Sequence, residues 1–434
     1  MANTLLTPVQ ITREGLRVLH NNLVFLKGVN RQYSDEFAQR GAKIGSTVNV
    51  RKPNKYFVRK GPVMQTQGTT ETYVPLTLNT QWGTDVSFSS TELTLSLDDF
   101  SKRILTPAMA RIAAQMDQDA LQGFITGSYT GPVVNGTTTT ATIGGSPVWN
   151  IVGTPGTTPG TGGGSATGLL QYNAPICYLN AGMMLDNNAA PRDMNRRVVM
   201  NPAAHAQSVA GLSGLYNDGE IVSEQYRKGV LGNALGFEFA MDQNIYTLTR
   251  GTASASIAIN TTNAGTGEST IITKTGTGTL VAGDVYTVAN VYSVNPENQQ
   301  STGQLQQFVV TSAITLSGTA DSISVAPAIV LAGTGIATGT VNRVPTANDV
   351  VTVVGAASTA TPQNLAYHQD AFTMATADLE LPSGVDFAAR ETYDGVSMRI
   401  VRAFDITNDQ FPCRIDVLGG FAALRPELAC RIAG

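Results

Sequence analysis

The chain has 434 residues, and 28 Lys and Arg stand against 32 Asp and Glu, a formal net charge of −4. This slightly acidic balance argues against a general nucleic-acid binder, which is normally basic. No apolar run of about eighteen residues occurs, so no membrane span is expected, and the first residues lack the pattern of a secretory signal. The length predicts one large domain with an insertion, or two to three domains.

Residues 1–43 are predicted to form an N-terminal arm. Leucines recur there at helical spacing: Leu16, Leu19, Leu23 and Leu26. Spacing of three or four residues indicates one face of a helix. Two interpretations stay open, a short surface helix or an extended arm that reaches a neighbouring subunit.

Residues 44–96 contain short, partly alternating apolar runs between turn residues, which predict a long two-stranded β-ribbon with a loop near 60–72. Six basic residues and no acid occur over 43–60: Lys43, Arg51, Lys52, Lys55, Arg59 and Lys60. Because an isolated hairpin is marginally stable, we expect the ribbon to lie on an acidic neighbour. The alternative partner of the ribbon is the phosphate backbone of a nucleic acid. Tyr56 and Phe57 lie among the basic residues, and aromatic side chains can stack on bases. The acidity of the whole chain favours the contact with protein.

Residues 97–127 give the clearest helical periodicity. The apolar positions are Leu105, Met109, Ile112, Met116, Ala120 and Phe124. Gly127 is expected to end this helix. Pro107 predicts either a kink or a restart with Thr106 as the cap.

Residues 128–249 are predicted to be an α/β region that begins with a Gly/Thr-rich loop over 128–168. A hairpin is expected within that loop near 141–151. The later elements are expected to be a helix at 169–187, a buried strand at 196–200, a helix at 203–215, and a turn and strand over 227–240.

Residues 250–362 carry very few charges, and short strands recur there between Gly, Asn and Thr turns. This pattern predicts a small all-β barrel or sandwich. Because α/β sequence lies on both sides, the segment is interpreted as an inserted domain. Residues 363–434 complete the α/β part, with strands expected at 372–379, 397–405 and 413–421.

The sequence shows no motif for catalysis. No phosphate-binding loop of the G-x-x-x-x-G-K-[ST] type, no H-E-x-x-H and no G-x-S-x-G occurs. The histidines His20, His205 and His368 are far apart in sequence. The cysteines Cys177, Cys413 and Cys430 are scattered and odd in number, which argues against a disulfide framework. We therefore expect no catalytic residue, no cofactor, no metal site and no enzyme activity.

The order of these parts resembles the HK97-like phage capsid fold, an α+β fold whose parts are called the N-arm, E-loop, spine helix, A-domain and P-domain. Within it, the chain looks like the P-22-type coat proteins, which also carry an inserted β-barrel. The block 196–203 and the later run YRKGVLGNALGFEF contribute to this likeness. The most specific feature is an A-x-R-P-E motif near the C-terminus: Ala423, Leu424, Arg425, Pro426 and Glu427.

The resemblance implies the major capsid protein of a tailed double-stranded DNA phage, which assembles with itself into pentamers and hexamers of an icosahedral shell. It implies a scaffolding protein, a portal at one vertex, packaged DNA on the inner surface and possible decoration proteins as partners, without a membrane. The protein would be located in the virion capsid, which would be assembled in the host bacterial cytoplasm. The six basic residues of 43–60 are the candidate assembly contacts. A secreted or surface β-rich adhesin, a non-capsid phage structural protein and an enzyme with an appended β-domain are the alternatives.

Overall fold

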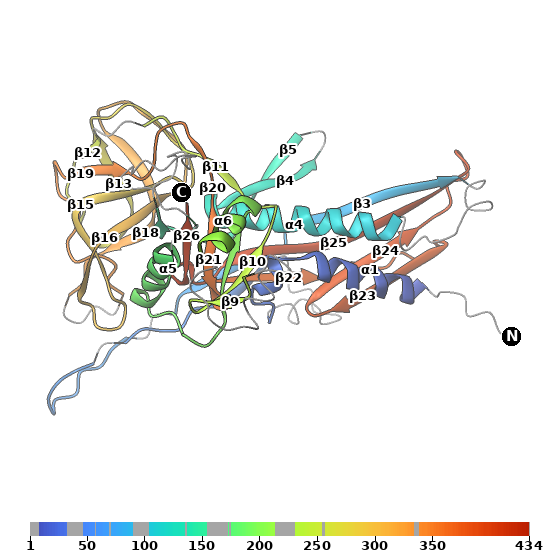
Figure 1. The fold of residues 1–434 in the computed structure, drawn as a ribbon, viewed down its shortest axis with the longest axis horizontal. Coiled ribbons are helices and arrows are strands. Elements are labelled where there is room, and N and C mark those ends of the chain that lie inside the picture. Colours follow the sequence, from blue (N-terminus) through green and yellow to red (C-terminus); the bar gives the residue numbers. More distant parts are fainter. Residues whose placement is uncertain are drawn as a thin grey trace.

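The computed structural model describes an elongated α+β molecule, with a barrel at one end and long strands at the other (Figure 1). The residues described are 8–32, 47–56, 58–68, 71–89, 104–134, 137–153, 172, 175–212, 231–253, 257–333 and 338–433. Lys43, the first part of the expected long helix (97–103), and residues 154–168 of the Gly/Thr-rich loop lie outside them. So do residues 213–230, which include the end of the helix expected at 203–215.

The long strands form one antiparallel sheet in the order β22-β25-β24-β23. Their bounds are Phe372–Ala377 for β22, Phe387–Tyr393 for β23, Val396–Arg402 for β24 and Gln410–Ala423 for β25. Strand β3 (Thr80–Ser89) pairs with β25 along its whole length, from Ser89 opposite Gln410 to Thr80 opposite Gly419. The expectation that residues 80–89 belong to the ribbon is therefore wrong. Apolar and polar residues alternate in a strand whether it pairs with the next strand of a hairpin or with a distant strand. The alternation in β3 therefore did not reveal its partner.

Helix α4 (Thr106–Thr126) lies along this sheet, and it confirms the described part of the long helix predicted over 97–127. It begins at Thr106 with Pro107 in its first turn, but residues 104 and 105 before it are already helical and Thr106 is not the cap, so the predicted restart is not confirmed. It ends at Gly127, whose φ of 85° is the left-handed conformation that glycine adopts without strain. The six predicted apolar positions are all buried. All six belong to the main hydrophobic core, where Phe124 stacks on Phe372 with ring centroids 4.2 Å apart.

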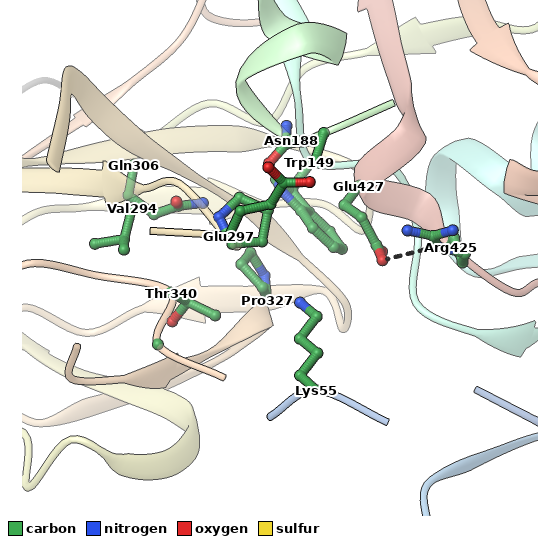
Figure 2. Close-up of a pocket in the computed structure, with 13 residues that line it drawn as sticks. Lys55, Trp149, Asn188, Val294, Glu297, Gln306, Pro327, Thr340, Arg425 and Glu427 are labelled. Carbon is green, nitrogen blue, oxygen red and sulfur yellow. Dashed lines mark ion pairs between the residues drawn. The ribbon is translucent and has the colours of Figure 1, made fainter. Parts of the chain in front are cut away.

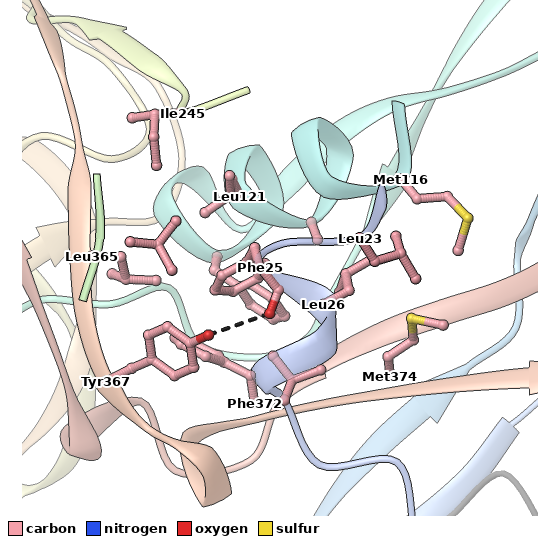
Figure 3. Close-up of a cluster of buried hydrophobic side chains, with 14 of the residues drawn as sticks. Leu23, Phe25, Leu26, Met116, Leu121, Ile245, Leu365, Tyr367, Phe372 and Met374 are labelled. Carbon is pink, nitrogen blue, oxygen red and sulfur yellow. Dashed lines mark hydrogen bonds between the residues drawn. The ribbon is translucent and has the colours of Figure 1, made fainter. Parts of the chain in front are cut away.

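The N-terminal helix α1 (Pro8–Asn22) packs against α4 and strands β23 and β24. All four of the predicted leucines are buried in the core of this same chain. Phe25 follows them into the core, and its carbonyl oxygen accepts a hydrogen bond of 3.3 Å from the Tyr367 hydroxyl (Figure 3). An extended arm is therefore wrong for residues 8–28, because their apolar face already has a partner here.

The segment after α1 is held by a buried carboxylate on α4. Asp117 is fully buried, and it accepts backbone N–H bonds from Val24 (2.8 Å) and Leu26 (3.0 Å). Burial first, and the nearby carboxylate of Asp242 second, raise the pKa of Asp117 to about 7. The two backbone donors oppose this shift by favouring the charged form.

Replacing Asp117 by Asn is expected to flatten the dependence of stability on pH. A folded-state pKa above the ordinary 3.8 means that the folded chain holds the proton more tightly. That contribution to stability is complete below about pH 4 and is lost as the pH rises through about 7. The unfolding free energy of Asp117→Asn relative to the native chain should therefore increase with pH in this window, by at most about 1.4 kcal/mol per pH unit. Urea unfolding of unassembled protein at several pH values measures this.

The matched control for that experiment is Asp321→Asn. The pKa of Asp321 is lowered, chiefly by a hydrogen bond from the Ser317 side chain, so this carboxylate stays charged throughout the window. Its stability difference from the native chain should be constant between about pH 5 and pH 7. An Asp117→Asn difference that is equally constant would contradict the raised pKa.

The central sheet has the order β7-β26-β21-β8-β10-β9. Its strands are β7 (Ile151–Val152), β8 (Arg196–Met200), β9 (Asn233–Ala234), β10 (Phe237–Met241), β21 (Asn364–His368) and β26 (Ala429–Ile432). Helices α5 (Pro175–Asn187) and α6 (Pro202–Leu212) belong to this part. The buried strand predicted at 196–200 is confirmed, and both helices overlap the predicted ranges.

A closed barrel is inserted between β10 and β21 and has the strand order β12-β13-β18-β16-β15-β19. The strands are β12 (Ile257–Ile259), β13 (Thr266–Lys274), β15 (Val285–Val294), β16 (Ser301–Val310), β18 (Asp321–Val330) and β19 (Val350–Val353). The short strands expected over 250–362 are confirmed by these six. Of the two architectures predicted, the barrel is the one observed, and it encloses its own apolar cluster.

The barrel is joined to the rest of the chain through a buried arginine. Arg431 on β26 has no exposed surface, and its guanidinium donates to the carbonyl oxygens of Gly283 (2.7 Å), Ile125 (2.9 Å) and Val148. These carbonyls belong to the barrel, to the end of α4 and to the segment after the hairpin described next. One side chain therefore connects three parts of the fold.

The Gly/Thr-rich loop begins with a hairpin, β4 (Ser128–Val134) paired with β5 (Thr137–Thr142), which projects from the end of α4 (Figure 1). The hairpin expected near 141–151 is therefore misplaced. The sequence carries Asn135 and Gly136 between the two strands, a dipeptide typical of tight β-hairpins.

Candidate assembly site

The ribbon consists of β1 (Thr47–Arg51), β2 (Tyr73–Thr77) and the residues between them. Its base is an antiparallel pair from Thr47 opposite Thr77 to Arg51 opposite Tyr73. One face of this pair is buried against the body of the molecule, in a cluster made by Val48, Val50, Val74, Leu76, Leu78, Ala375, Ala422 and Leu424. The base is thus fixed by apolar packing, whereas the rest of the ribbon extends away from the body (Figure 1).

Glycines allow the ribbon backbone to approach the sheet closely. A Cβ atom at Gly420 would lie 1.9 Å from the carbonyl oxygen of Thr77, and one at Gly144 would lie 1.8 Å from that of Pro75. Such contacts are impossible without displacing backbone. The ribbon base can therefore lie at this distance from the sheet only because both positions are glycine, which has no side chain.

Gly420→Ala is expected to loosen the ribbon base, because the new methyl group must push β2 away from β25. Amide hydrogen exchange over 47–51 and 73–77 should become at least about tenfold faster, as local opening becomes easier. Gly68→Ala is the matched control, since a Cβ there meets nothing within 4 Å. Unchanged exchange in Gly420→Ala would show that the close approach is absent.

The ribbon tip, defined here as residues 58–68, presents apolar side chains to solvent. Val58 is 90% exposed, Val63 75% and Met64 77%. Contiguous exposed apolar residues on a projecting element mark a surface that meets another macromolecule. Sequence reasoning missed these residues, although an apolar Val-Met pair directly after the Gly61-Pro62 turn was a usable signal.

The candidate basic residues fall into three groups. Arg51 is exposed and forms a 3.3 Å ion pair with Glu71 across the ribbon. Arg59 and Lys60 are exposed at the tip, where the Arg59 guanidinium donates to the carbonyl oxygen of Gly61. The last group, Lys52 and Lys55, lies near Glu427 where the ribbon leaves the body.

Lys52 is half-buried, and burial lowers the pKa of its ammonium although the neighbouring Glu427 opposes this shift. Lys55 points into a cavity of about 330 Å³ that also contacts Trp149, Glu297 and Glu427 (Figure 2). Arg59 and Lys60 are therefore exposed on the tip, whereas Lys52 is half-buried and Lys55, although exposed, lines a cavity of this chain.

The opposite end of the molecule carries a second exposed surface, the acidic loop, defined here as residues 403–409 between β24 and β25. Ile406 is 84% exposed and Phe404 47%; Asp405 lies between them in the chain, and Asp409 ends the loop. Hydrogen bonds from Asn408 and Thr407 lower the pKa of Asp405, so this side chain is charged at neutral pH. Apolar side chains and negative charge at this end match apolar side chains and positive charge at the ribbon tip.

The groups that would carry chemistry are dispersed in the structure. His20 lies 2.8 Å from Asp394, His368 lies 3.0 Å from Asp193, and His205 is buried elsewhere. The three cysteines are buried and unpaired. Within the described ranges, no group of three or more His, Cys, Asp or Glu side chains is arranged to hold a metal ion. None of the helices described is long and apolar enough to cross a membrane.

Residues 178–434 match the family model described as "P22 coat protein - gene protein 5". This match covers more than half of the chain and includes the inserted barrel, the C-terminal strands and the A-x-R-P-E motif. The chain belongs to the P22 coat protein family. The predicted α+β, HK97-like capsid fold with an inserted all-β domain agrees with this membership and with the order of elements.

Solved structures with similar folds come from several viruses and particles. A chain of "Mycobacterium phage Che8" is 10% identical, with 94% of this coat protein and 90% of that chain covered and a TM-score of 0.42. "Capsid of Ralstonia phage GP4" is 9% identical over 95% and 91%, with a TM-score of 0.41. A virus-like particle from Pyrococcus furiosus is 9% identical over 98% and 97%, with a TM-score of 0.37. No curated protein matches, so the family assignment rests on residues 178–434.

Proposed function

We propose that this coat protein is the major capsid protein of a tailed double-stranded DNA phage, which assembles into pentamers and hexamers of an icosahedral shell around the genome. The observation that carries the proposal, beside the family, is the ribbon. It projects from the body with a tip on which Val58, Val63 and Met64 are exposed beside exposed Arg59 and Lys60. A monomeric protein rarely exposes such a surface, whereas a shell subunit covers it with a neighbour.

The contact that we propose joins the ribbon tip of one subunit to the acidic loop of a neighbour. The two surfaces lie at opposite ends of the molecule, so their contact is head-to-tail (Figure 1). Head-to-tail contacts close into rings when the rotation between subunits allows it. Val63 and Met64 would pack on Phe404 and Ile406, while the Arg59 and Lys60 charges face Asp405.

Arg59 and Lys60 are the members of the predicted basic set that we propose for this contact. Arg51 is paired with Glu71, and Lys52 and Lys55 face this chain. Lys43 lies outside the described residues and remains a candidate on sequence alone.

The division of the chain predicted from the sequence is proposed with one change. Residues 80–89 belong with the sheet of β22–β25, and residues 90–96, the end of the segment predicted as 44–96, lie outside the described residues. The other segments are 1–43, 44–79, 97–127, 128–249, 250–362 and 363–434. In the terms of the family, these are the N-arm, E-loop, spine helix, A-domain, inserted domain and completion of the A- and P-domains.

We further propose that the protein has no catalytic role and acts through partners expected for its family. These are a scaffolding protein during assembly, a portal at one vertex, packaged DNA on the inner surface and decoration proteins outside. Assembly would take place in the host bacterial cytoplasm, and the final place is the virion capsid.

The experiment that tests the proposed function is imaging of the expressed protein. Co-expression with its phage's scaffolding protein in bacteria, followed by negative-stain electron microscopy, should show closed particles several subunit lengths across. Dispersed monomers in both the presence and the absence of scaffold would argue for one of the alternatives, such as an adhesin.

A further inference from the structure

The paired residues at the base of the ribbon pack on the body of the molecule. The Lys52 N–H donates to the carbonyl oxygen of Thr72 (2.8 Å), which closes the base. Lys55 is the outermost residue on this strand of the ribbon that lines the 330 Å³ cavity, and Tyr56 is already 59% exposed. Lys55 is therefore the ribbon residue that meets the body at this cavity.

Two carboxylates line the same cavity from different parts of the fold (Figure 2). Glu427 belongs to the short helix η4 (Pro426–Leu428) of the C-terminal region, where Arg425 pairs with it at 3.6 Å. Glu297 lies in the turn between barrel strands β15 and β16, where its backbone N–H donates to the Asn295 side chain (2.9 Å). One wall is thus the C-terminal region and the other is the inserted barrel.

We propose that Lys55 is a two-position latch, which holds the ribbon at one angle when it pairs with Glu427 and at another when it pairs with Glu297. This proposal rests on the proposed assembly function. The ion pair described for Glu427 is the one with Arg425, and Lys52 also faces this carboxylate, so Glu427 is shared by several cations. Lysine suits this role because its ammonium is a point charge on a flexible stem that reaches either partner.

A latch of this kind would help identical subunits to form a closed shell. Subunits in pentamers and hexamers meet their neighbours at different angles, so each ribbon must take more than one direction. A switch between two discrete contacts of similar strength gives such a choice without refolding the chain. The A-x-R-P-E motif then has a physical role, since its Arg and Glu form the C-terminal wall of the latch.

The test uses carbodiimide, which couples an amine to a carboxylate only where the two touch. Applied to unassembled native protein, it should give Lys55–Glu427 and Lys55–Glu297 linked peptides by mass spectrometry. Each should exceed Lys60–Glu427 by at least about tenfold, because groups within one cavity have a high effective concentration. Lys60 is the matched control, since it is exposed on the same ribbon outside the cavity.

Two further variants connect the latch with assembly. Glu427→Gln should leave only the linkage to Glu297, and Glu297→Gln only that to Glu427. The two variants should shift the particle-size distribution in opposite directions, as each favours one ribbon angle. A single linkage in the native protein, or unchanged particles from both variants, would overturn the latch while leaving the assembly function in place. Failure of the native protein to form shells would instead remove the proposed function, and the latch with it.

Discussion

Reversing the charge of the ribbon tip, with Arg59→Glu and Lys60→Glu together, is expected to raise the concentration needed for shell assembly and to leave a folded, soluble coat protein. Both side chains are exposed and lie beyond the part of the ribbon that packs on the body. Fold stability should therefore change little, as is usual for exposed positions. At the proposed contact, two attractions to the acidic loop become repulsions.

The size of this effect follows from the number of contacts. An exposed ion pair contributes about 0.2–1 kcal/mol, and placing like charges opposite each other has a similar effect of opposite sign. The double reversal should weaken each contact by about 2 kcal/mol, and 1.4 kcal/mol corresponds to a tenfold change in an equilibrium constant. The concentration at which shells appear, measured by light scattering or sedimentation, should thus rise at least about tenfold.

The control is an equal change of charge elsewhere, Arg111→Glu with Lys274→Glu. Arg111 is exposed on α4, and Lys274 on barrel strand β13 donates to the Asn348 side chain. These variants should assemble at nearly the native concentration. If the ribbon-tip variant forms normal shells at the native concentration, the proposed ribbon contact is wrong. If neither variant assembles, the effect comes from net charge alone.

Arg431→Met should be the most destabilising single substitution considered for the fold. The buried guanidinium donates to three backbone carbonyl oxygens, and Met would provide no donor for them. The nearby Asp284 is also buried and would lose a stabilising cation. Burial lowers the pKa of Arg431 to about 9, so the native side chain is still charged at neutral pH.

Removing one member of a buried charged network is destabilising by about 3–5 kcal/mol. Urea unfolding of unassembled Arg431→Met should show a loss of this order, and hydrogen exchange should rise where the barrel, α4 and β26 meet. The control is Arg13→Met, whose side chain is 69% exposed and pairs with Glu391 at 3.3 Å. It should change stability by less than about 0.5 kcal/mol. A loss below about 1 kcal/mol in Arg431→Met would contradict the connecting role of this arginine.

Elements with their own periodicity were predictable from the sequence. The apolar spacing that ends at Phe124 predicted the long helix, and the alternation of strands with Gly and Asn turns predicted the barrel. Both patterns depend on neighbours a few residues apart, so they are readable without knowledge of the fold. The C-terminal motif identified the family for the same reason.

Features that depend on distant partners were not predictable. Strand β3 alternates as a ribbon strand would, yet its partner β25 follows it by more than three hundred residues. The leucines of α1 are helical by spacing, but only the structure shows that they pack on this chain. At Gly420 and Gly144 the backbone of the ribbon base comes very close to residues that are distant in sequence, and no local sequence pattern reveals this.

The six basic residues expected to make assembly contacts stay a prediction. Their clustering in the sequence placed them on one ribbon, but charge alone did not separate Arg59 and Lys60 at the tip from Lys52 and Lys55 near Glu427. That separation requires burial and neighbours. The acidic loop was missed because Asp405 and Asp409 are ordinary turn residues by sequence, and the exposure of Phe404 and Ile406 appears only in three dimensions.

A cryo-electron microscopy map of assembled particles most directly tests the proposal that the exposed ribbon tip of each subunit is covered by a neighbouring subunit. The map should place Val63 and Met64 of each subunit on a neighbour, beside Phe404 and Ile406, with those side chains losing most of their exposed surface. Particles in which the ribbon tips remain in solvent, or fold back on their own subunit, would contradict it.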